Sequence, residues 1–370
     1  MVGRHRPTLA RLRAVGGYGR AVNRIKVAVL LGGRSTEHEI SCISAQSIVA
    51  ALDPARYEVS VVGIGRDGRW VRAVDGGLGI ISTDGRLPEI SADAPDADLS
   101  TCLAVDVVFP VLHGPWGEDG TVQGLLETLN VPYVGSGVLS SAVSMDKGFM
   151  KSALAHAGLD GGRYVVVTDR RWRADPHAVL TEISGLGFPV FVKPARAGSS
   201  LGIAKVHAAS GLPEAIEAAR KHDPRVIVEA GVVAAREIEC GVLVDAEGVP
   251  HASRCAEIIV NERHEFYDFE AKYLDDSATL VVPADLPPGV EEAVRDLAVR
   301  AFEALDCEGL ARADFFVRPD GSVVINEVNT MPGFTAISMY PRMWAATGVD
   351  YPALVDRLIA DAIRKGTGLH

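Results

Sequence analysis

The pattern of apolar and polar residues divides the chain into three blocks, and the first block alternates strands with helices. It predicts, in order, a strand at Ile25–Leu31, a helix that ends near Leu52, a strand at Tyr57–Ile64, a strand at Val105–Leu112 and a helix at Gly120–Leu129. Strands joined by helices in this way pack side by side as a parallel sheet. We therefore expect an α/β domain over residues 23–139.

The second block, residues 140–237, predicts a smaller domain of mixed strands and helices. We expect one helix at Ser140–Ala157, which Gly158 ends, and one further clear helix at Leu212–Lys221. Short strands are expected at Tyr164–Thr168, Val190–Lys193, Gly202–Val206 and Val226–Glu229.

The third block, residues 238–370, predicts a second mixed domain. Strands follow Ile238, and a polar and aromatic stretch occupies residues 261–276. The remainder predicts a helix at Pro288–Leu305, a hairpin at Leu310–Val328 and two closing helices. The expected fold class is therefore a multidomain protein with α/β and α+β parts.

Length and composition narrow the class of protein. The 370 residues exceed one ordinary domain, and 48% hydrophobic with 23% charged residues is typical of a soluble globular protein. No apolar run approaches the ~18 residues that a membrane span needs, so we expect no membrane partner. The net charge is −11, so we expect no binding to nucleic acid through charge.

Residues 1–22 differ from the rest of the chain in charge, because they hold five arginines and no acidic residue. A targeting peptide is one interpretation of this composition. The apolar stretch of a secretory signal is absent, and we favour a disordered extension.

The five cysteines are scattered and contain no C-x-x-C pair. This pattern indicates neither a disulfide framework nor a zinc site. We expect reduced, mostly buried cysteines in a cytoplasmic protein.

The hairpin at Leu310–Val328 carries the clearest chemical signal. Asp320-Gly321 predicts a two-residue turn, which places Asp314 opposite Glu327 and Arg312 opposite Asn329. Side chains alternate along a strand, so these four lie on one face of the ribbon. Two carboxylates that face each other at ~5 Å destabilise a hairpin unless a cation neutralises them.

Carboxylate oxygens beside an amide suit Mg²⁺, so this face predicts a metal site made by Asp314, Glu327 and Asn329. The alternative is a protonated or Arg312-bridged pair that serves the structure alone. Beside a metal, Arg312 could stabilise charge on a transferring phosphoryl group.

Three loops are further candidates for ligand binding. Lys193 ends a strand before the flexible Ala197–Ser200 stretch, which could hold phosphate oxygens, although the Walker spacing is absent and a plain hairpin turn is the alternative. His113 opens a glycine-rich loop at the carboxyl end of a strand, where α/β folds bind ligands, or it forms an ordinary loop hydrogen bond. Glu37 could receive a substrate ammonium or stand exposed at a helix start.

These loops belong to a set of five motifs whose order resembles that of D-alanine–D-alanine ligases. The motifs are Gly32–Glu39, His113–Gly120, Lys193–Ser200, Phe266–Tyr273 and Asn326–Gly333. The resemblance runs from about Ile25 to the C-terminus and is greatest to the actinobacterial branch. It implies an ATP-grasp fold, in which two lobes hold the nucleotide, with an N-terminal parallel α/β lobe before them in the chain.

The resemblance also implies a role for each matching residue. Glu37 would anchor the amine of the first substrate and connect through Ser199 to Tyr273, and His113 would lie near the same substrate. The implied nucleotide contacts are Lys147, Lys193, Ser200, Glu229, Glu237 and Lys272. The implied metal ligands are Asp314, Glu327 and Asn329, with Arg312 and the Gly333 amide near the reacting groups, and Ser338 with Met339 at the second substrate's carboxylate.

The activity implied is the joining of two D-alanines with ATP and two Mg²⁺ or Mn²⁺ ions, through an acyl phosphate, for peptidoglycan precursor synthesis. Residues 261–276 would form the closing loop, and a homodimer is expected. The chain departs from the family by one extra residue between Glu229 and Glu237 and by Phe269 in place of a tyrosine. The rivals are a ligase that makes D-alanyl-D-lactate, an ATP-grasp ligase for other substrates, or a catalytically silent nucleotide-binding protein.

Overall fold

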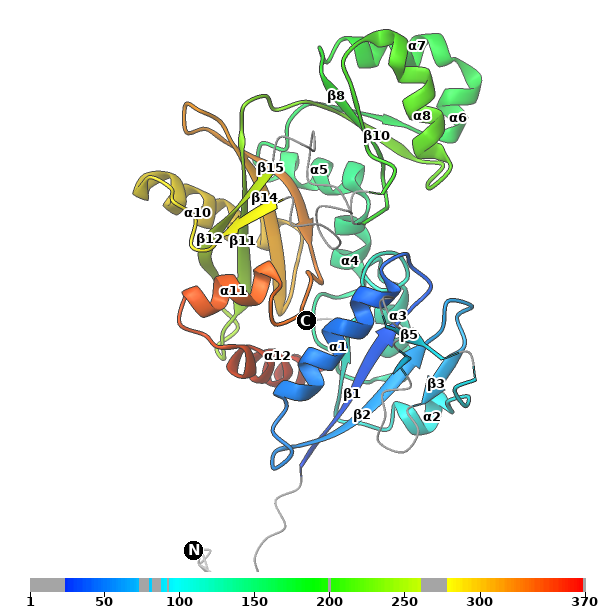
Figure 1. Ribbon diagram of the computed structural model, residues 1–370, viewed down its shortest axis with the longest axis vertical. Coiled ribbons are helices and arrows are strands. Elements are labelled where there is room, and N and C mark those ends of the chain that lie inside the picture. Colours follow the sequence, from blue (N-terminus) through cyan, green and yellow to red (C-terminus); the bar gives the residue numbers. More distant parts are fainter. Residues whose placement is uncertain are drawn as a thin grey trace, which may run out of the picture.

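The computed structural model describes residues 24–72, 80–81, 88–91, 93–198, 201–260 and 278–368. The expected N-terminal extension (1–22), the expected closing loop (261–276) with Phe269, Lys272 and Tyr273, and also Ser199 and Ser200, lie outside the described residues. Figure 1 shows three regions along the long axis: the sheet with β1 and β2 at the bottom, the sheet with β11 and β14 in the middle, and the small region with β8 and β10 at the top.

The first sheet has the strand order β3-β2-β1-β6, and β1 pairs in parallel with β2 and β6. Its elements are β1 (Ile25–Gly32), α1 (His38–Ala51), β2 (Tyr57–Ile64), β3 (Trp70–Arg72), β6 (Val107–Pro110) and α3 (Thr121–Leu129), with the short β4 (Ile80–Ile81), β5 (Glu89–Ile90) and α2 (Leu99–Cys102) beside them. Strand β1 is buried from Val27 onward, as expected for the centre of a parallel sheet covered on both faces. The predicted β-α-β beginning is present.

In the small sheet each strand is antiparallel to its neighbours, and the strand order is β7-β10-β8-β9. Its elements are β7 (Tyr164–Val167), α6 (Asp169–Ala174), α7 (Pro176–Ser184), β8 (Val190–Pro194), β9 (Ala204–Val206), the 3-10 turn at Ala209–Gly211, α8 (Leu212–Arg220) and β10 (Val226–Ala230). The sequence predicted only α8 among these helices, so α6 and α7 were missed. Both begin at a side-chain cap, Thr168 and Asp175, and α7 has a proline in its first turn.

The predicted single helix at Ser140–Ala157 is two helices, α4 (Val138–Met145) and α5 (Lys147–His156). The break falls at Asp146, whose backbone is extended and whose carboxylate accepts the N–H groups of Gly148 and Phe149 at 3.0 and 3.1 Å. Asp146 therefore acts as an N-cap that starts a new helix. Its second oxygen pairs with Arg225 at 2.8 Å, which fixes the break from the small sheet.

The third sheet has the order β13-β12-β11-β14-β15 and is antiparallel throughout. Its elements are β11 (Arg236–Val244), β12 (Pro250–Val260), β13 (Ala278–Val281), α10 (Pro288–Ala304), β14 (Leu310–Val317) and β15 (Val323–Asn329), followed by α11 (Met339–Ala346) and α12 (Tyr351–Lys365). Helices α5 and α10 cover one face, where Met150 and Leu154 join Phe302 and Phe315 in one core.

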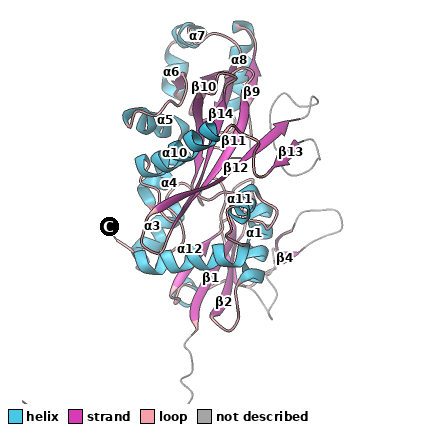
Figure 2. Ribbon diagram, turned by 90° about the vertical axis from the view of Figure 1, so that its left-hand side faces the viewer, coloured by secondary structure: helices cyan, strands magenta, loops and turns pink. Residues whose placement is uncertain are grey.

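The closing helices connect the third sheet to the first. Figure 2 shows α12 running across the molecule next to α1 and β1, and α12 contacts both α1 and β6. Phe334 and Tyr340 share one apolar core with Val29 and Phe109 of the first sheet. This packing brings the loop that follows β15 to the first sheet, where Met331 contacts His113 in the loop after β6. Within the described residues, no helix combines the length and apolar character that crossing a membrane requires.

Candidate active site

One cavity of about 1050 Å³ lies where the three sheets meet. A cavity of this size is at the upper end of those that hold a single small ligand, so it has room for a nucleotide and a small substrate together. Every predicted site residue that the structure describes lines it: Glu37, His113, Lys147, Lys193, Glu229, Glu237, Arg312, Asp314, Glu327, Asn329, Gly333, Ser338 and Met339. The structure places these residues together, and their individual roles stay predictions.

The hairpin β14–β15 forms the floor of this cavity. Asp314 pairs with Glu327 and Arg312 with Asn329, as the sequence predicted. The turn differs from the predicted two-residue turn, however, because it is three residues long. Arg318 pairs with Ser322, and Gly321 takes a φ of +83°. That shifts the register by one residue near the turn.

A β-bulge between Asp314 and Phe315 shifts the register back. Phe315 pairs with Ile325 and Asp314 with Glu327, so Asn326 is the extra residue. Its carbonyl oxygen accepts a hydrogen bond from Lys151 Nζ at 3.2 Å, and its Oδ1 lies 3.5 Å from Lys193 Nζ. The two irregularities cancel, and the bulge adds a polar residue to the cavity wall.

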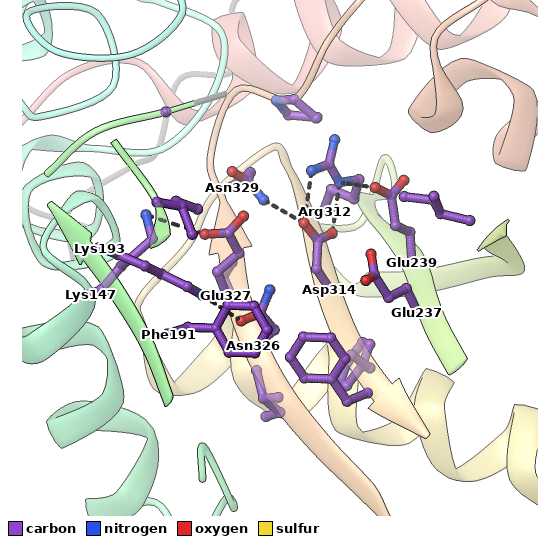
Figure 3. Close-up of a pocket in the computed structure, with 18 of the residues that line it drawn as sticks. Lys147, Phe191, Lys193, Glu237, Glu239, Arg312, Asp314, Asn326, Glu327 and Asn329 are labelled. Carbon is purple, nitrogen blue, oxygen red and sulfur yellow. Dashed lines mark hydrogen bonds and ion pairs between the residues drawn. The ribbon is translucent and has the colours of Figure 1, made fainter. Parts of the chain in front are cut away.

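The opposed carboxylates have different cationic partners. Arg312 binds Asp314 through two hydrogen bonds, Nε to Oδ1 at 2.7 Å and Nη2 to Oδ2 at 2.8 Å, and its Nε lies 3.3 Å from Glu239. Glu327 lies 3.2 Å from Lys147 Nζ. Figure 3 shows these side chains converging from β11, β14, β15 and α5. Arg312 thus connects Asp314 with Glu239, whereas Glu327 pairs with Lys147, so these contacts do not form the Arg312 bridge between the two opposed carboxylates that the sequence left open.

The pKa of Arg312 is raised well above its ordinary value although burial acts in the opposite direction, because Asp314 and Glu239 lie beside it. The donor set of Asp314, Glu327 and the Asn329 amide fits a hard cation such as Mg²⁺, which prefers oxygen ligands. Across the described residues, no group of three or more histidine, cysteine, aspartate or glutamate side chains is arranged to hold a metal ion. The amide oxygen would have to complete the set.

A buried lysine–glutamate–lysine cluster lines the opposite wall. Glu229 lies 2.8 Å from Lys151 Nζ and 2.5 Å from Lys193 Nζ. Burial would raise the pKa of Glu229, but the two lysines lower it to about 2. The pKa of Lys193 is raised although its burial acts in the opposite direction, because the negative charges of Glu229 and Glu327 lie beside it. Lys151 was missed by the sequence reasoning, although it follows Lys147 by one helical turn and so lies on the same face of α5.

Glu37 is buried at the start of α1, where the loops of two sheets meet it. A Cβ atom added at Gly114 would lie 2.7 Å from its Oε2, and one added at Gly198 would lie 2.4 Å from the same atom. The carboxylate therefore lies close to the backbone of both loops, and a side chain at either glycine would require Glu37 to shift. Gly114 also has a φ of +73°, a second reason for glycine at that position.

His113 is buried and both of its ring nitrogens have partners. Nδ1 lies 3.0 Å from the carbonyl oxygen of Met331, so Nδ1 carries the proton, and Nε2 accepts from the Ser44 hydroxyl at 3.1 Å. Burial lowers the pKa of His113, which favours the neutral ring. The side chain is a hydrogen-bonding group fixed in one tautomer.

The sequence did not predict a role for Glu118 either, although Glu118 belongs to the same motif, His113–Gly120, as His113. Its Oε2 accepts the Gly114 N–H at 2.5 Å and its Oε1 accepts the Met331 N–H at 3.0 Å. Burial, and then the nearby charge of Glu37, raise the pKa of Glu118 to about 8. The position of Glu118 in the motif could have indicated a functional acid. Its partner, however, is the backbone N–H of Met331, which lies far along the chain.

The loop after β15 brings the last group of predicted residues into the cavity. Ser338 Oγ accepts the Thr335 N–H at 3.0 Å and lies 2.7 Å from Thr335 Oγ1. A Cβ atom added at Gly333 would lie 3.2 Å from Ser338 Oγ, so the two residues face each other closely. Met339 begins α11 and is buried.

The sequence profile described as "D-ala D-ala ligase N-terminus" matches residues 26–136, and the one described as "D-ala D-ala ligase C-terminus" matches residues 153–360. The chain belongs to the D-alanine–D-alanine ligase family. This confirms the resemblance that the motifs indicated.

Individual members of the family are similar over nearly the whole chain. The D-alanine–D-alanine ligase of Mycobacterium sp. (strain KMS) is 53% identical over 94% of this chain and 98% of its own, and that of Arthrobacter sp. (strain FB24) is 50% identical over 93% and 95%. The predicted likeness to the actinobacterial branch is confirmed.

Solved structures agree on the fold. The D-alanine–D-alanine ligase from Coxiella burnetii has a TM-score of 0.75 and 37% identity, covering 92% of this chain and 94% of its own. The VanG D-Ala:D-Ser ligase from Enterococcus faecalis has a TM-score of 0.77 and 33% identity, covering 92% and 100%. The predicted ATP-grasp fold class is therefore confirmed.

Proposed function

We propose that this protein uses ATP to join two D-alanines into D-alanyl-D-alanine, through a D-alanyl phosphate intermediate, for peptidoglycan precursor synthesis. Membership of the ligase family supports the reaction. The observation that carries it to this chain is the meeting of buried lysines, the acidic hairpin and Glu37 in one cavity. A polyphosphate, a divalent cation and an ammonium group each find a partner there.

The cationic side chains supply the nucleotide part of the site. In the structure Lys147, Lys193 and Arg312 each pair with a carboxylate. We infer that phosphate oxygens take over these cations when ATP binds, because charge-assisted bonds to phosphate replace those to carboxylate at little cost. Glu229 and Glu237 would then face the adenine and ribose, as the family resemblance implies.

The carboxylates released in this way, with Asn329, would hold the two divalent ions, Mg²⁺ or Mn²⁺, that the resemblance implies. When bound, these ions neutralise phosphate charge as the phosphoryl group is transferred. Asp314 and Glu327 bind and orient, and Arg312 keeps a positive charge at the same point. The high pKa of Arg312 leaves it charged throughout the working pH range.

The chemistry then has two steps. A carboxylate oxygen of the first D-alanine attacks the γ-phosphorus, and ADP leaves. The amine of the second D-alanine attacks the acyl carbon, phosphate leaves with the bonding electron pair, and the amine loses its proton. The tetrahedral intermediate of this second step carries an oxyanion, which Arg312 and the Gly333 N–H would stabilise.

The remaining roles are proposed from the family resemblance. Ser338 and Met339 would bind the second carboxylate, His113 and Glu37 the first substrate, and Ser199, Ser200, Lys272 and Tyr273 would complete the site from residues outside the described ranges. We further propose domains at 23–139, 140–237 and 238–370, a cytoplasmic location and a homodimer.

The test is to incubate the protein with MgATP and D-alanine and to identify the product. We expect D-alanyl-D-alanine and one ADP per dipeptide, and no dipeptide from L-alanine. Parallel reactions with D-serine and D-lactate as acceptors separate this activity from that of the D-Ala:D-Ser ligase to which the chain is similar and from depsipeptide synthesis. ATP turnover without any dipeptide would overturn the proposal.

A further inference from the structure

The backbone of Met331 is held at two points by side chains of a loop more than two hundred residues earlier in the chain. Its N–H donates to Glu118 Oε1 at 3.0 Å, and its carbonyl oxygen accepts from His113 Nδ1 at 3.0 Å. Both side chains belong to the loop after β6 of the first sheet, whereas Met331 follows β15 of the third. The contact therefore joins two lobes through one residue.

This contact imitates strand pairing. Met331 precedes Pro332, and a proline disfavours helical backbone at the residue before it, which favours an extended conformation there. In extended backbone the N–H and C=O of one residue point to the same side, where a neighbouring strand would bind both. Here a carboxyl and an imidazole take the place of that strand, and Met331 itself is buried.

The side chains of Glu118, the acceptor, and His113, the donor, are themselves held in place by further hydrogen bonds. Glu118 Oε2 accepts the Gly114 N–H at 2.5 Å, so the carboxyl is tied to its own loop as well as to Met331. Ser44 lies 3.1 Å from His113 Nε2, and its hydroxyl keeps that nitrogen an acceptor and Nδ1 a donor. Glu118 and His113, which together form a clamp on the backbone of Met331, therefore each have only one orientation that makes these bonds.

The position of the Gly333 N–H depends on this clamp. Pro332 has no N–H and a fixed φ near −65°, so the first free backbone donor after Met331 is that of Gly333. With Met331 fixed and Pro332 rigid, few torsions remain between the clamp and that donor.

We propose that Glu118 and His113 are positioning residues that aim the Gly333 N–H at the oxyanion of the second reaction step. This inference rests on the proposed function. The donor must point at the place where negative charge develops, and removing one such donor typically slows a reaction about 10²–10³-fold. A displaced donor loses part of that, and the acyl phosphate then has time to react with water to D-alanine and phosphate.

The measurement is the ratio of dipeptide formed to ADP released by the full-length enzyme at saturating D-alanine. In Glu118→Gln one acceptor oxygen becomes an amide NH₂, so the side chain can accept only one of the two N–H groups, of Gly114 and Met331. We expect wild-type enzyme to give a ratio near one and Glu118→Gln to give a ratio roughly tenfold lower, with ADP release continuing. Loss of stability alone lowers both products together and leaves the ratio unchanged.

The chain offers a matched control in the next residue. Asp119 also accepts two backbone N–H groups, from Trp116 at 2.8 Å and Thr121 at 3.0 Å, but both lie in its own loop. Asp119→Asn therefore makes the same chemical change without touching Met331. Its ratio should stay near one.

A second variant tests the hydrogen bond from His113 to Met331. His113→Gln removes the donor at the Nδ1 position, and it should lower the ratio as well. Because both side chains hold the backbone of one residue, the ratio for the double variant Glu118→Gln/His113→Gln should fall little below that of the poorer single variant. If Glu118→Gln does not fold, His113→Gln alone decides the question.

Three results would overturn the inference: a ratio near one in both single variants, equal losses in Glu118→Gln and Asp119→Asn, or strictly multiplicative losses in the double variant. Absence of dipeptide with the wild-type enzyme would overturn the proposed function and this inference with it. If the wild-type enzyme makes dipeptide at a ratio near one and both single variants do the same, the inference is overturned and the proposed function stands.

Discussion

The Nζ atom of Lys151 lies 2.8 Å from a carboxylate oxygen of Glu229, and this ion pair connects α5 to the small sheet inside the cavity wall. Lys151 also donates to the carbonyl oxygens of Gly161 and Asn326 at 2.6 and 3.2 Å. Only 3% of its side chain is exposed, so all three contacts are shielded from water. Lys151 thereby neutralises the charge of Glu229 inside the cavity wall.

Lys151→Met should weaken both folding and ATP binding. Removing one partner of a buried ion pair costs ~3–5 kcal/mol when the other charge is left alone, and less here because Lys193 remains. Glu229 would then hold Lys193 more firmly, so we expect the KM for ATP to rise roughly tenfold, or ~1.4 kcal/mol. Urea unfolding and ATP titration measure the two effects. The control is Lys221→Met, on an exposed lysine, and equal behaviour of the two variants would contradict the prediction.

Glu118 should make the stability of the protein depend on pH. Burial and Glu37 raise its pKa from 4.5 to about 8, so the folded protein binds this proton more tightly than the unfolded chain does. Its contribution to stability is therefore complete below pH 4.5 and is lost as the pH rises to about 8, by at most ~1.4 kcal/mol per pH unit.

Glu118→Gln does not titrate, so the difference in unfolding free energy between wild type and variant isolates this group. We expect the wild type to lose stability relative to Glu118→Gln as the pH is raised from below to above neutrality. Urea unfolding of both proteins at each pH gives the difference. Parallel curves would mean that the carboxyl is already ionised in the folded protein.

The sequence predicted the opposed pairs of the hairpin correctly, but for an incomplete reason. It assumed a two-residue turn and regular pairing, whereas a longer turn at Gly321 and a bulge at Asn326 cancel each other. A bulge leaves no clear signal in one sequence, because it depends on how the strand packs against its neighbours. The motifs were sufficient to indicate the family, which the comparisons confirm.

The residues that were missed share a physical property. Glu118 and Lys151 bind backbone groups, of Met331, Gly161 and Asn326, and a backbone N–H or C=O is the same for every residue type. Nothing in the sequence marks which of them will face a given side chain. The break at Asp146 was missed for a related reason, since helical spacing continues across it and only the cap shows the interruption.

Glu327→Gln should reduce Mg²⁺-dependent ADP release sharply while the protein stays folded. The amide keeps the shape of the side chain but loses the charge that a divalent ion requires, and Lys147 loses its partner at 3.2 Å. The measurement is initial rate against Mg²⁺ concentration, with thermal unfolding as the check on folding. Full activity at limiting Mg²⁺ would remove Glu327 from the proposed metal ligands.

Thr335→Val should weaken binding of the second D-alanine while leaving the first site intact. Ser338 Oγ accepts the Thr335 N–H, and one of the two hydroxyls must donate to the other across 2.7 Å. If Ser338 directs its proton to the substrate carboxylate, as proposed, the Thr335 hydroxyl has to supply the second bond to Ser338 Oγ. Valine has nearly the same shape but no donor.

The loss of one neutral hydrogen bond is worth ~0.5–1.5 kcal/mol, which corresponds to a rise of up to about tenfold in the KM for the second D-alanine. Thr335→Ser retains the hydroxyl and is the matched control. Initial rates over a wide range of D-alanine concentrations separate the tight first site from the weaker second site. The role of Thr335 fails if its valine variant keeps the wild-type KM, or if the serine variant is as weak as the valine variant, because the hydroxyl would then not be the group that matters.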